Sequence, residues 1–220
     1  MGSIVLSTTA WYYLFILFVI TAKIMSYIIA GLGNPGEKYE GTRHNTGRLV
    51  LEHFAKKIEA GEWEENKKIK ARVAEGKIGR EKITLVEPEA FMNNSGKSLT
   101  SLVKSKKAAG ELVVIYDDLD LPLGTLKLSF DRGSGGHRGL ESIIKALKTR
   151  AFIRLRVGVS PSTPSGKLKK PSGEKAVIDF ILGKWKPKEV EAFKKILKKS
   201  TDALTLIVSE GREKAMGEIN

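Results

Sequence analysis

The sequence contains no cysteine, and this absence removes several kinds of chemistry. Disulfide scaffolds, thiolate catalysis and cysteine-ligated zinc sites are all excluded, and nothing requires an oxidising compartment. Histidine is also scarce, with only His44, His53 and His137 among 220 residues. Three histidines leave little material for a histidine-rich metal site. Any catalytic imidazole therefore has to be one of these three rings.

Acidic residues are few compared with basic ones. The chain has 25 Asp and Glu against 38 Lys and Arg, which gives a formal net charge of +13. Much of the excess lies in residues 167–199, where eleven lysines face four acidic residues. Such a charge fits an acidic polymer or a membrane surface as partner. Ordinary solvation of a lysine-rich surface explains it equally well.

Residues 1–24 differ from the rest of the chain. Residues 11–22 are apolar except for Thr21, and with residues 4–10 they approach the ~20 residues of a membrane span. No Lys or Arg precedes this run, so it lacks the basic region of a secretory signal. A membrane anchor, a bound terminal helix and a start codon assigned too early, with Met25 as the true start, all remain open. We favour the early start and expect one domain over residues 25–220.

Short apolar runs alternate with helical patterns along that domain. Strands are expected at residues 27–30, 68–78, 82–86, 112–116, 125–130 and 153–159, with a hairpin turn at Gly79-Arg80. Helices are expected at residues 46–60, 93–105, 138–148 and 187–209, and a mobile loop at residues 160–173. The run at 112–116 is too apolar to be half exposed. This order predicts a three-layer α/β sandwich with a mixed, mostly parallel central sheet.

A glycine-rich loop follows the first expected strand and formally matches the dinucleotide-binding pattern G-x-G-x-x-G, in residues 31–36. In that pattern the helix starts inside the glycine run, so that its N-terminus faces a pyrophosphate. Here Pro35 and residues 37–41 intervene before any helical pattern. The acidic residue that should end a second strand is also missing, since Glu52 lies in an expected helix. The glycines are better explained as turn formers.

His44 and Asp117 are the candidate catalytic pair. Ligands bind beyond the carboxyl ends of strands in open α/β sheets, and both residues follow such ends. A carboxylate can hold an imidazole in one tautomer and stabilise its cation, as a general base requires. Asp118 and Asp120 compete with Asp117 for this role. A metal loop built on the three acids is disfavoured, because it would need more oxygen ligands and a glycine turn.

Several segments together resemble the bacterial peptidyl-tRNA hydrolase family. They occur in family order over roughly residues 26–185. The matching stretches are IAGLGNPGEKYEGTRHNTG, EPEAFMNNSGKSL, VIYDDLDLPLGTLKL, GSGGHRGLESII and FIRLRVGV. The resemblance implies a fold of the phosphorylase/hydrolase-like kind and a monomeric, cytoplasmic esterase without metal or cofactor. Its substrate would be peptidyl-tRNA, cut at the ester that joins the peptide to the 3′ end of the tRNA.

The resemblance also implies roles for individual residues. His44 matches the proton acceptor, and Asp117 matches the acid that supports it. Asn34 matches a residue that helps to distinguish a blocked peptide from a free aminoacyl amine. The remaining implied contacts are Tyr39, Phe91 and Asn93 in the binding cleft, and Lys127 and Arg156 on the tRNA 5′ phosphate.

Arg138 departs from the family pattern. The motif GGHNG of well-known members is Gly-Gly-His-Arg-Gly here, at residues 135–139. An amide both donates and accepts hydrogen bonds, whereas a guanidinium only donates and is always charged. Arg138 is expected to bind a phosphate or a peptide carbonyl instead. The departure leaves open one alternative function, a non-catalytic RNA-binding relative of the same fold.

Overall fold

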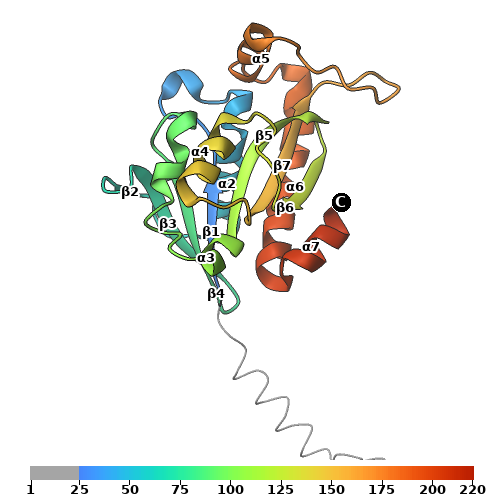
Figure 1. Cartoon of the computed structure of the whole chain (residues 1–220). Coiled ribbons are helices and arrows are strands. Elements are labelled where there is room, and N and C mark those ends of the chain that lie inside the picture. Colours follow the sequence, from blue (N-terminus) through green and yellow to red (C-terminus); the bar gives the residue numbers. More distant parts are fainter. Residues whose placement is uncertain (1–24) are drawn as a thin grey trace, which may run out of the picture.

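A seven-stranded sheet forms the centre of the molecule (Figure 1). In the computed structural model, which describes residues 25–220, the strand order is β2-β3-β4-β1-β5-β7-β6. The strands are β1 (Ser26–Gly31), β2 (Glu64–Asn66), β3 (Ala71–Ile78), β4 (Glu81–Pro88), β5 (Leu112–Pro122), β6 (Leu126–Phe130) and β7 (Ile153–Ser160).

The four central strands are parallel and the outer ones are antiparallel. β1 pairs in parallel with β4 and β5, and β5 pairs in parallel with β7. β2 and β3 extend one edge in antiparallel fashion, and β6 closes the other. The predicted mixed, mostly parallel sheet is therefore confirmed, as is the predicted hairpin, formed by β3 and β4.

Helices cover both faces of the sheet and complete three layers (Figure 1). One apolar core packs Val50 and Phe54 of α2, and Ile196 and Leu204 of α6, against alternate strand residues such as Ile115. The other core contains Met92, Leu99, Leu140 and further residues from the opposite strand face. The α-helices are α2 (Thr46–Lys57), α3 (Lys106–Gly110), α4 (Arg138–Leu147), α5 (Glu174–Ile181), α6 (Pro187–Glu210) and α7 (Arg212–Ile219), and the 3-10 turns are η1 (Glu37–Tyr39), η2 (Arg43–Asn45) and η3 (Met92–Ser98).

The predicted helix at residues 93–105 is wrong. η3 ends at Ser98, and the separate helix α3 begins only after Ser105, whose side chain caps it. The Ser95 hydroxyl donates to the Met92 carbonyl at 2.9 Å, a local bond that competes with regular helical bonding. Gly96 lies against the backbone of α4, where a side chain would collide with Ser142. Tertiary packing therefore decides the conformation of this segment.

One strand boundary and two helices also differ from the sequence-based expectation. The strand expected to end at residue 116 continues to Pro122, because Asp117 and Asp118 pair in register with β7. The loop expected at residues 160–173 begins after Ser160, the last residue of β7, and contains a single β-bridge between Ser162 and Leu168. Helices α5 and α7 form where no helix was predicted.

The expected extension at residues 1–24 lies outside the described residues. Within residues 25–220, no helix combines the length and apolar character needed to cross a membrane.

The first turn of α2 lies directly against the carboxyl ends of β1 and β5. The Leu32 amide donates to the Ile115 carbonyl at 2.9 Å, and the Arg48 amide donates to the Leu32 carbonyl at 3.2 Å. A Cβ added to Gly47 would collide with the Ile115 oxygen and lie 2.5 Å from the Leu32 amide nitrogen. Glycine at this position lets η2, just before α2, reach the middle of β5.

We expect Gly47→Ala to destabilise the protein strongly. The added methyl meets backbone atoms that cannot move aside, and such overpacking typically costs about 1–3 kcal/mol or more. Gly110→Ala is the matched control, since nothing lies within 4 Å of a Cβ there. Denaturant unfolding of both variants measures the difference, and equal transition midpoints would show that the helix–strand contact is not tight.

Candidate active site

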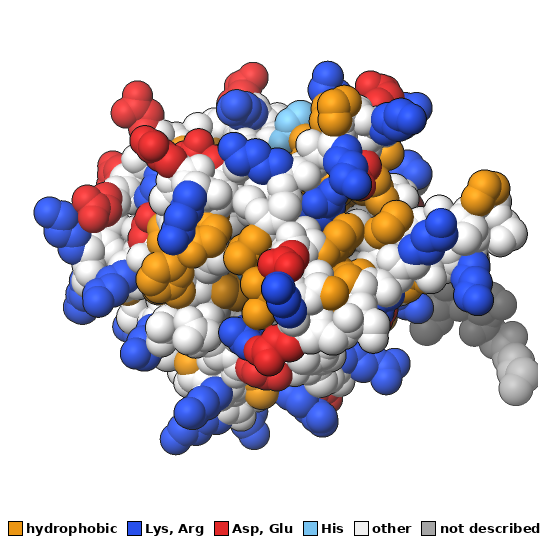
Figure 2. Space-filling view, turned by 90° about the horizontal axis from the view of Figure 1, so that it is seen from above, with side chains coloured by type: hydrophobic (Ala, Val, Ile, Leu, Met, Phe, Trp, Pro, Cys, Tyr) orange, Lys and Arg blue, Asp and Glu red, His pale blue; other side chains and the backbone are white. Residues whose placement is uncertain are grey.

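A cavity of about 1040 Å³ lies at the carboxyl ends of the parallel strands. His44, Asp117 and His137 line it together with Asn34 and the apolar side chain of Phe91. Figure 2 looks onto this end of the molecule and shows hydrophobic side chains with both basic and acidic side chains around them. The cavity is therefore partly apolar, and charged side chains of both signs line it.

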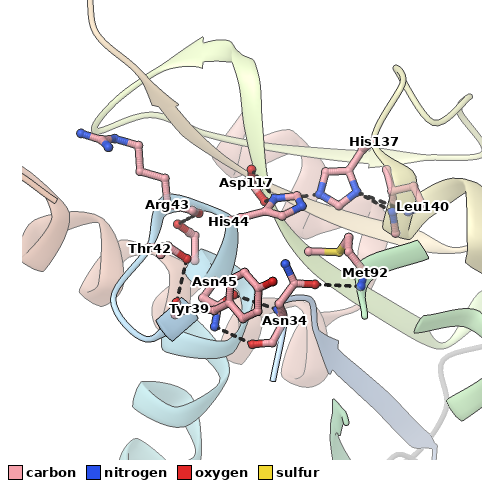
Figure 3. A network of polar contacts seen from close by, with 12 residues as sticks. Asn34, Tyr39, Thr42, Arg43, His44, Asn45, Met92, Asp117, His137 and Leu140 are labelled. Carbon is pink, nitrogen blue, oxygen red and sulfur yellow. Dashed lines mark hydrogen bonds and ion pairs between the residues drawn. The ribbon is translucent and has the colours of Figure 1, made fainter. Parts of the chain in front are cut away.

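His44 and Asp117 meet in this cavity, as the sequence predicted (Figure 3). His44 Nδ1 lies 3.0 Å from Asp117 Oδ1 and 3.1 Å from Oδ2. Both residues are buried. His44 lies in η2 and Asp117 in β5, and the two residues are 73 positions apart in sequence. An ionised carboxylate can only accept, so Nδ1 carries the proton. The lone pair of His44 is therefore on Nε2, where it can accept a proton.

The pair shifts both pKa values. Burial disfavours the imidazolium, but the charge of Asp117 and its hydrogen bond outweigh this and raise the pKa of His44 above 6.5. For Asp117, burial alone would raise the pKa. The charge of His44 and hydrogen bonds from His137 and His44 outweigh burial and hold the pKa of Asp117 well below its usual range. Asp117 thus stays ionised, and His44 is a stronger base than an isolated imidazole.

His137 is a second partner of Asp117, to which the motif analysis gave no role. Its Nε2 lies 3.3 Å from Asp117 Oδ1, and its ring lies 5.3 Å from that of His44. Its Nδ1 accepts hydrogen bonds from the amides of Gly139 and Leu140 at 3.2 and 3.3 Å. His137 therefore caps α4 and carries its proton on Nε2, which donates to Asp117.

His44, Asp117 and His137 form the one group among residues 25–220 with enough clustered ligand atoms to hold a metal ion. The hydrogen bonding opposes such a use. The Nε2 of His137 needs a free lone pair to bind a cation, but that nitrogen carries the proton. Moving the proton to Nδ1 would place it against two donating amides. The arrangement suits a hydrogen-bonded chain of two imidazoles and one carboxylate.

Asn34 is held beneath His44 by three hydrogen bonds (Figure 3). Its amide nitrogen donates to Asn45 Oδ1 at 2.8 Å, and Asn45 Nδ2 donates to the Asn34 carbonyl at 2.9 Å. Its side-chain oxygen accepts from the Met92 amide at 2.9 Å. The Nδ2 group of Asn34 remains available as a donor toward the cavity that it lines.

Comparison with known proteins agrees with this geometry. The family model for peptidyl-tRNA hydrolase matches residues 28–220. The peptidyl-tRNA hydrolase of Herpetosiphon aurantiacus is 42% identical over 196 residues, covering 88% of this chain and 90% of its own. That of Thermoanaerobacter sp. is 40% identical and covers 88% and 99%. The crystal structure of the enzyme from Acinetobacter baumannii has a TM-score of 0.78 at 30% identity, covering 90% of this chain and 97% of its own.

The chain belongs to the peptidyl-tRNA hydrolase family. The match covers nearly all the described residues, and the alternating strands and helices adopt the family fold. The resemblance inferred from the five motifs is therefore confirmed.

The acids that competed with Asp117 have other partners in this family member. Asp118 Oδ2 accepts from Arg156 Nε at 2.7 Å, and exposed Asp120 pairs with Lys170 at 2.6 Å. No hydrogen bond or ion pair joins either acid to His44 among the described residues. Asp117 is thus the acid that contacts the ring.

The predicted cleft and phosphate residues of the peptidyl-tRNA hydrolase motifs lie around the same cavity. Phe91, 56% exposed, and Asn93 line it directly, whereas Tyr39 touches Phe91 edge-on from outside, with ring centres 6.3 Å apart. Lys127 of β6 and Arg156 of β7 are direct neighbours in the sheet and also line the cavity.

Arg138, where well-known members carry asparagine, projects at the rim. Its Nη2 donates to Glu174 Oε1 of α5 at 2.9 Å, and both side chains are largely exposed. The guanidinium is therefore already paired, although solvent competes for that pair.

We expect Asp117→Asn to lower the pKa of His44. Loss of the carboxylate charge leaves burial as the dominant influence, so the pKa should fall below 6.5. NMR titration of the His44 ring measures the change. Asp120→Asn is the matched control, since that exposed acid pairs with Lys170 instead. An unchanged His44 titration in the Asp117 variant would show that the carboxylate does not support the ring.

Proposed function

We propose that the protein hydrolyses the ester bond between a peptide and the 3′ end of tRNA, with His44 as general base and Asp117 as its support. The observation that carries the proposal is the 3.0 Å contact between His44 Nδ1 and Asp117 inside an open cavity. Membership of the peptidyl-tRNA hydrolase family supplies the substrate.

In the first step, His44 Nε2 accepts a proton from a water molecule as the water oxygen attacks the ester carbonyl carbon. The Nδ1–H of the resulting imidazolium donates to Asp117, whose negative charge stabilises it. The carbonyl oxygen becomes an oxyanion. An amide of Asn93 or a backbone N–H would stabilise that charge, a contribution of about 3 kcal/mol per donor.

In the second step, the tetrahedral intermediate collapses and the bond to the tRNA oxygen breaks. His44 returns its proton to that oxygen, which leaves as the free 3′-terminal hydroxyl, while the peptide leaves as a carboxylic acid. Asn34 Nδ2 is positioned to donate to a peptide carbonyl, a group present in a blocked peptide beside the scissile ester. The reaction needs no metal or cofactor, because the base is an imidazole of the chain.

The tRNA would contact the basic side of the cavity. Lys127 and Arg156 are adjacent there, and we assign them to the 5′ phosphate. The lysines of residues 167–199, on the loop before α5 and on α6, extend this surface for the acceptor stem. We infer that the protein acts as a monomer, because one chain supplies every group of the site. We infer a cytoplasmic location from the family's substrate, peptidyl-tRNA, which is a product of translation.

The rival function is an RNA-binding relative without turnover, which would keep the basic surface but not need a working base. The hydrogen-bonded His44–Asp117 pair argues against it, because RNA binding alone does not require a buried carboxylate behind a cavity-facing imidazole.

We expect His44→Ala to reduce hydrolysis of N-blocked aminoacyl-tRNA by about 10²–10⁴-fold, because general-base help is lost. Asp117→Asn should reduce the rate less, since a neutral amide can still orient the ring. Steady-state kinetics at fixed pH measure both effects. His53→Ala, which alters an exposed ring on α2, serves as the control. Full activity of the His44 variant would remove this residue from the mechanism.

We expect the affinity for tRNA to fall steeply with salt concentration, because phosphate contacts release counterions. Lys127→Ala should weaken binding and reduce the slope of log K against log salt by about 1. Lys82→Ala is the control, since that exposed residue lies at the opposite end of the sheet. Titrations at several salt concentrations give both slopes, and a flat dependence would mean that the basic surface serves only solvation.

A further inference from the structure

Helix α5 has an apolar face that belongs to neither core. Val177, Ile178 and Ile181 of α5 and Leu182, the residue that caps its C-terminus, recur at helical spacing, and all four line the active-site cavity. None of them is part of the two clusters that pack the sheet. Phe91 at 56% and Leu182 at 37% are the two exposed large hydrophobic side chains of residues 25–220, and both face this cavity. The face is therefore placed to meet a ligand.

A buried arginine fastens the C-terminal end of α5. Arg43 Nη1 donates to the carbonyls of Phe180, Gly183 and Lys184 at 3.3, 3.2 and 3.1 Å. Its Nη2 donates to Glu189 Oε2 of α6 at 2.6 Å. Carbonyls at a helix C-terminus lack partners within the helix, and a cation there is favourable. Arg43 thus satisfies the end of α5 and joins it to α6.

Aromatic rings enclose the guanidinium of Arg43. It lies 4.5 Å from the centre of the Phe180 ring and 5.2 Å from that of Trp185. The side chain is only 4% exposed. A lysine could not replace it fully, because a single ammonium cannot present the planar fork that reaches carbonyls and a carboxylate together.

The turn that carries His44 is held separately. Asn45 N donates to the Thr42 carbonyl at 3.1 Å, and Thr46 Oγ1 donates to the Arg43 carbonyl at 2.6 Å. These bonds use the main chain of η2, not the guanidinium. In Figure 3 the side chain of Arg43 extends away from His44. Loss of the guanidinium should therefore loosen α5 and leave the His44–Asp117 pair in place. The Arg43 amide, which donates to the Gly183 carbonyl at 3.1 Å, and the β-bridge between Thr42 and Lys184 would remain.

The N-terminal end of α5 has a weaker attachment. The Arg138–Glu174 pair joins it to α4, and both side chains are more than half exposed. Exposed pairs of this kind contribute little to stability. Figure 1 shows α5 beyond the ends of the strands, at the top of the view. The position of its apolar face therefore depends mainly on its C-terminal end, where the Arg43 guanidinium makes most of the side-chain hydrogen bonds.

We propose that Arg43 is a positioning residue that holds the apolar face of α5 over the cavity, and that this face binds apolar side chains of the substrate peptide. The second half rests on the proposed function. The ligand of this apolar face is inferred from its location. The same cavity contains His44, beside which the ester must lie. A peptide attached to that ester enters a cavity that the four apolar side chains line.

The test compares two N-blocked dipeptidyl-tRNAs on one tRNA, one with two leucines and one with two serines. Arg43→Gln should raise KM for the leucine substrate by about ten-fold, the scale on which a hydrophobic pocket discriminates. KM for the serine substrate and kcat for both substrates should change by less than about two-fold. The pH at which the rate falls on acidification should stay the same. Arg150→Gln, at an exposed pair with Asp131, is the matched control and should behave like the wild type.

Two other variants cover the case in which Arg43→Gln does not fold. Ile178→Ala combined with Leu182→Ala trims half-exposed side chains and should remove the leucine preference without changing the serine kinetics. Glu189→Gln removes the negative charge beside Arg43 but keeps an oxygen acceptor, and it should raise KM for the leucine substrate to a smaller extent.

An equal rise of KM for both substrates, a fall of kcat or an altered pH profile in Arg43→Gln would overturn the proposal. So would an unchanged leucine preference in the double alanine variant. Hydrogen exchange tests the role of Arg43 independently of the proposed function, which fails if the wild type hydrolyses neither substrate. In that case, faster exchange of the α5 amides in Arg43→Gln than in Arg150→Gln would still show that Arg43 holds α5 in place. Equal exchange in the two variants would show that it does not.

Discussion

The buried carboxylate of Asp117 is the group around which this end of the sheet is arranged. An ionised carboxylate removed from water is unfavourable unless it is paired and hydrogen-bonded. Its two partners, His44 and His137, come from η2 and from the glycine-rich loop before α4. Both segments must therefore close on β5 before the charge is accommodated. The same contacts leave Nε2 of His44 free at the cavity. The contacts that stabilise the buried charge of Asp117 therefore also make His44 basic.

Much of this arrangement could be predicted from the sequence, because it is set by local patterns and one rule of topology. The apolar run at 112–116 identifies a central strand, and parallel strands bring their carboxyl ends to one edge. That rule alone places the segments containing His44 and Asp117 side by side. It could not choose between Asp117, Asp118 and Asp120. The choice is made by β5, which continues past residue 116 and turns Asp118 toward Arg156.

The features that the sequence did not reveal all depend on tertiary contacts. His137 lies in a motif that was recognised, but its hydrogen bond to Asp117 requires α4 to sit at a particular distance from β5. Helix α5 is short and follows a long loop, and its end is stabilised by Arg43, which is 137 residues away from Phe180. No local sequence pattern indicates that a residue so far away in the chain binds the end of α5. The helix expected at 93–105 likewise does not form, because Gly96 packs against the backbone of α4.

Arg138 shows how the site accommodates a charged residue beside its base. A nearby guanidinium opposes protonation of His44, and it does lower the pKa of that ring, but as the last of four influences. Its side chain is 63% exposed and paired with Glu174, so solvent and an opposite charge both weaken its field. Asp117, by contrast, is buried and in direct contact with the ring, where screening is least. The carboxylate therefore controls the protonation of His44, and an arginine at position 138 is compatible with a working base.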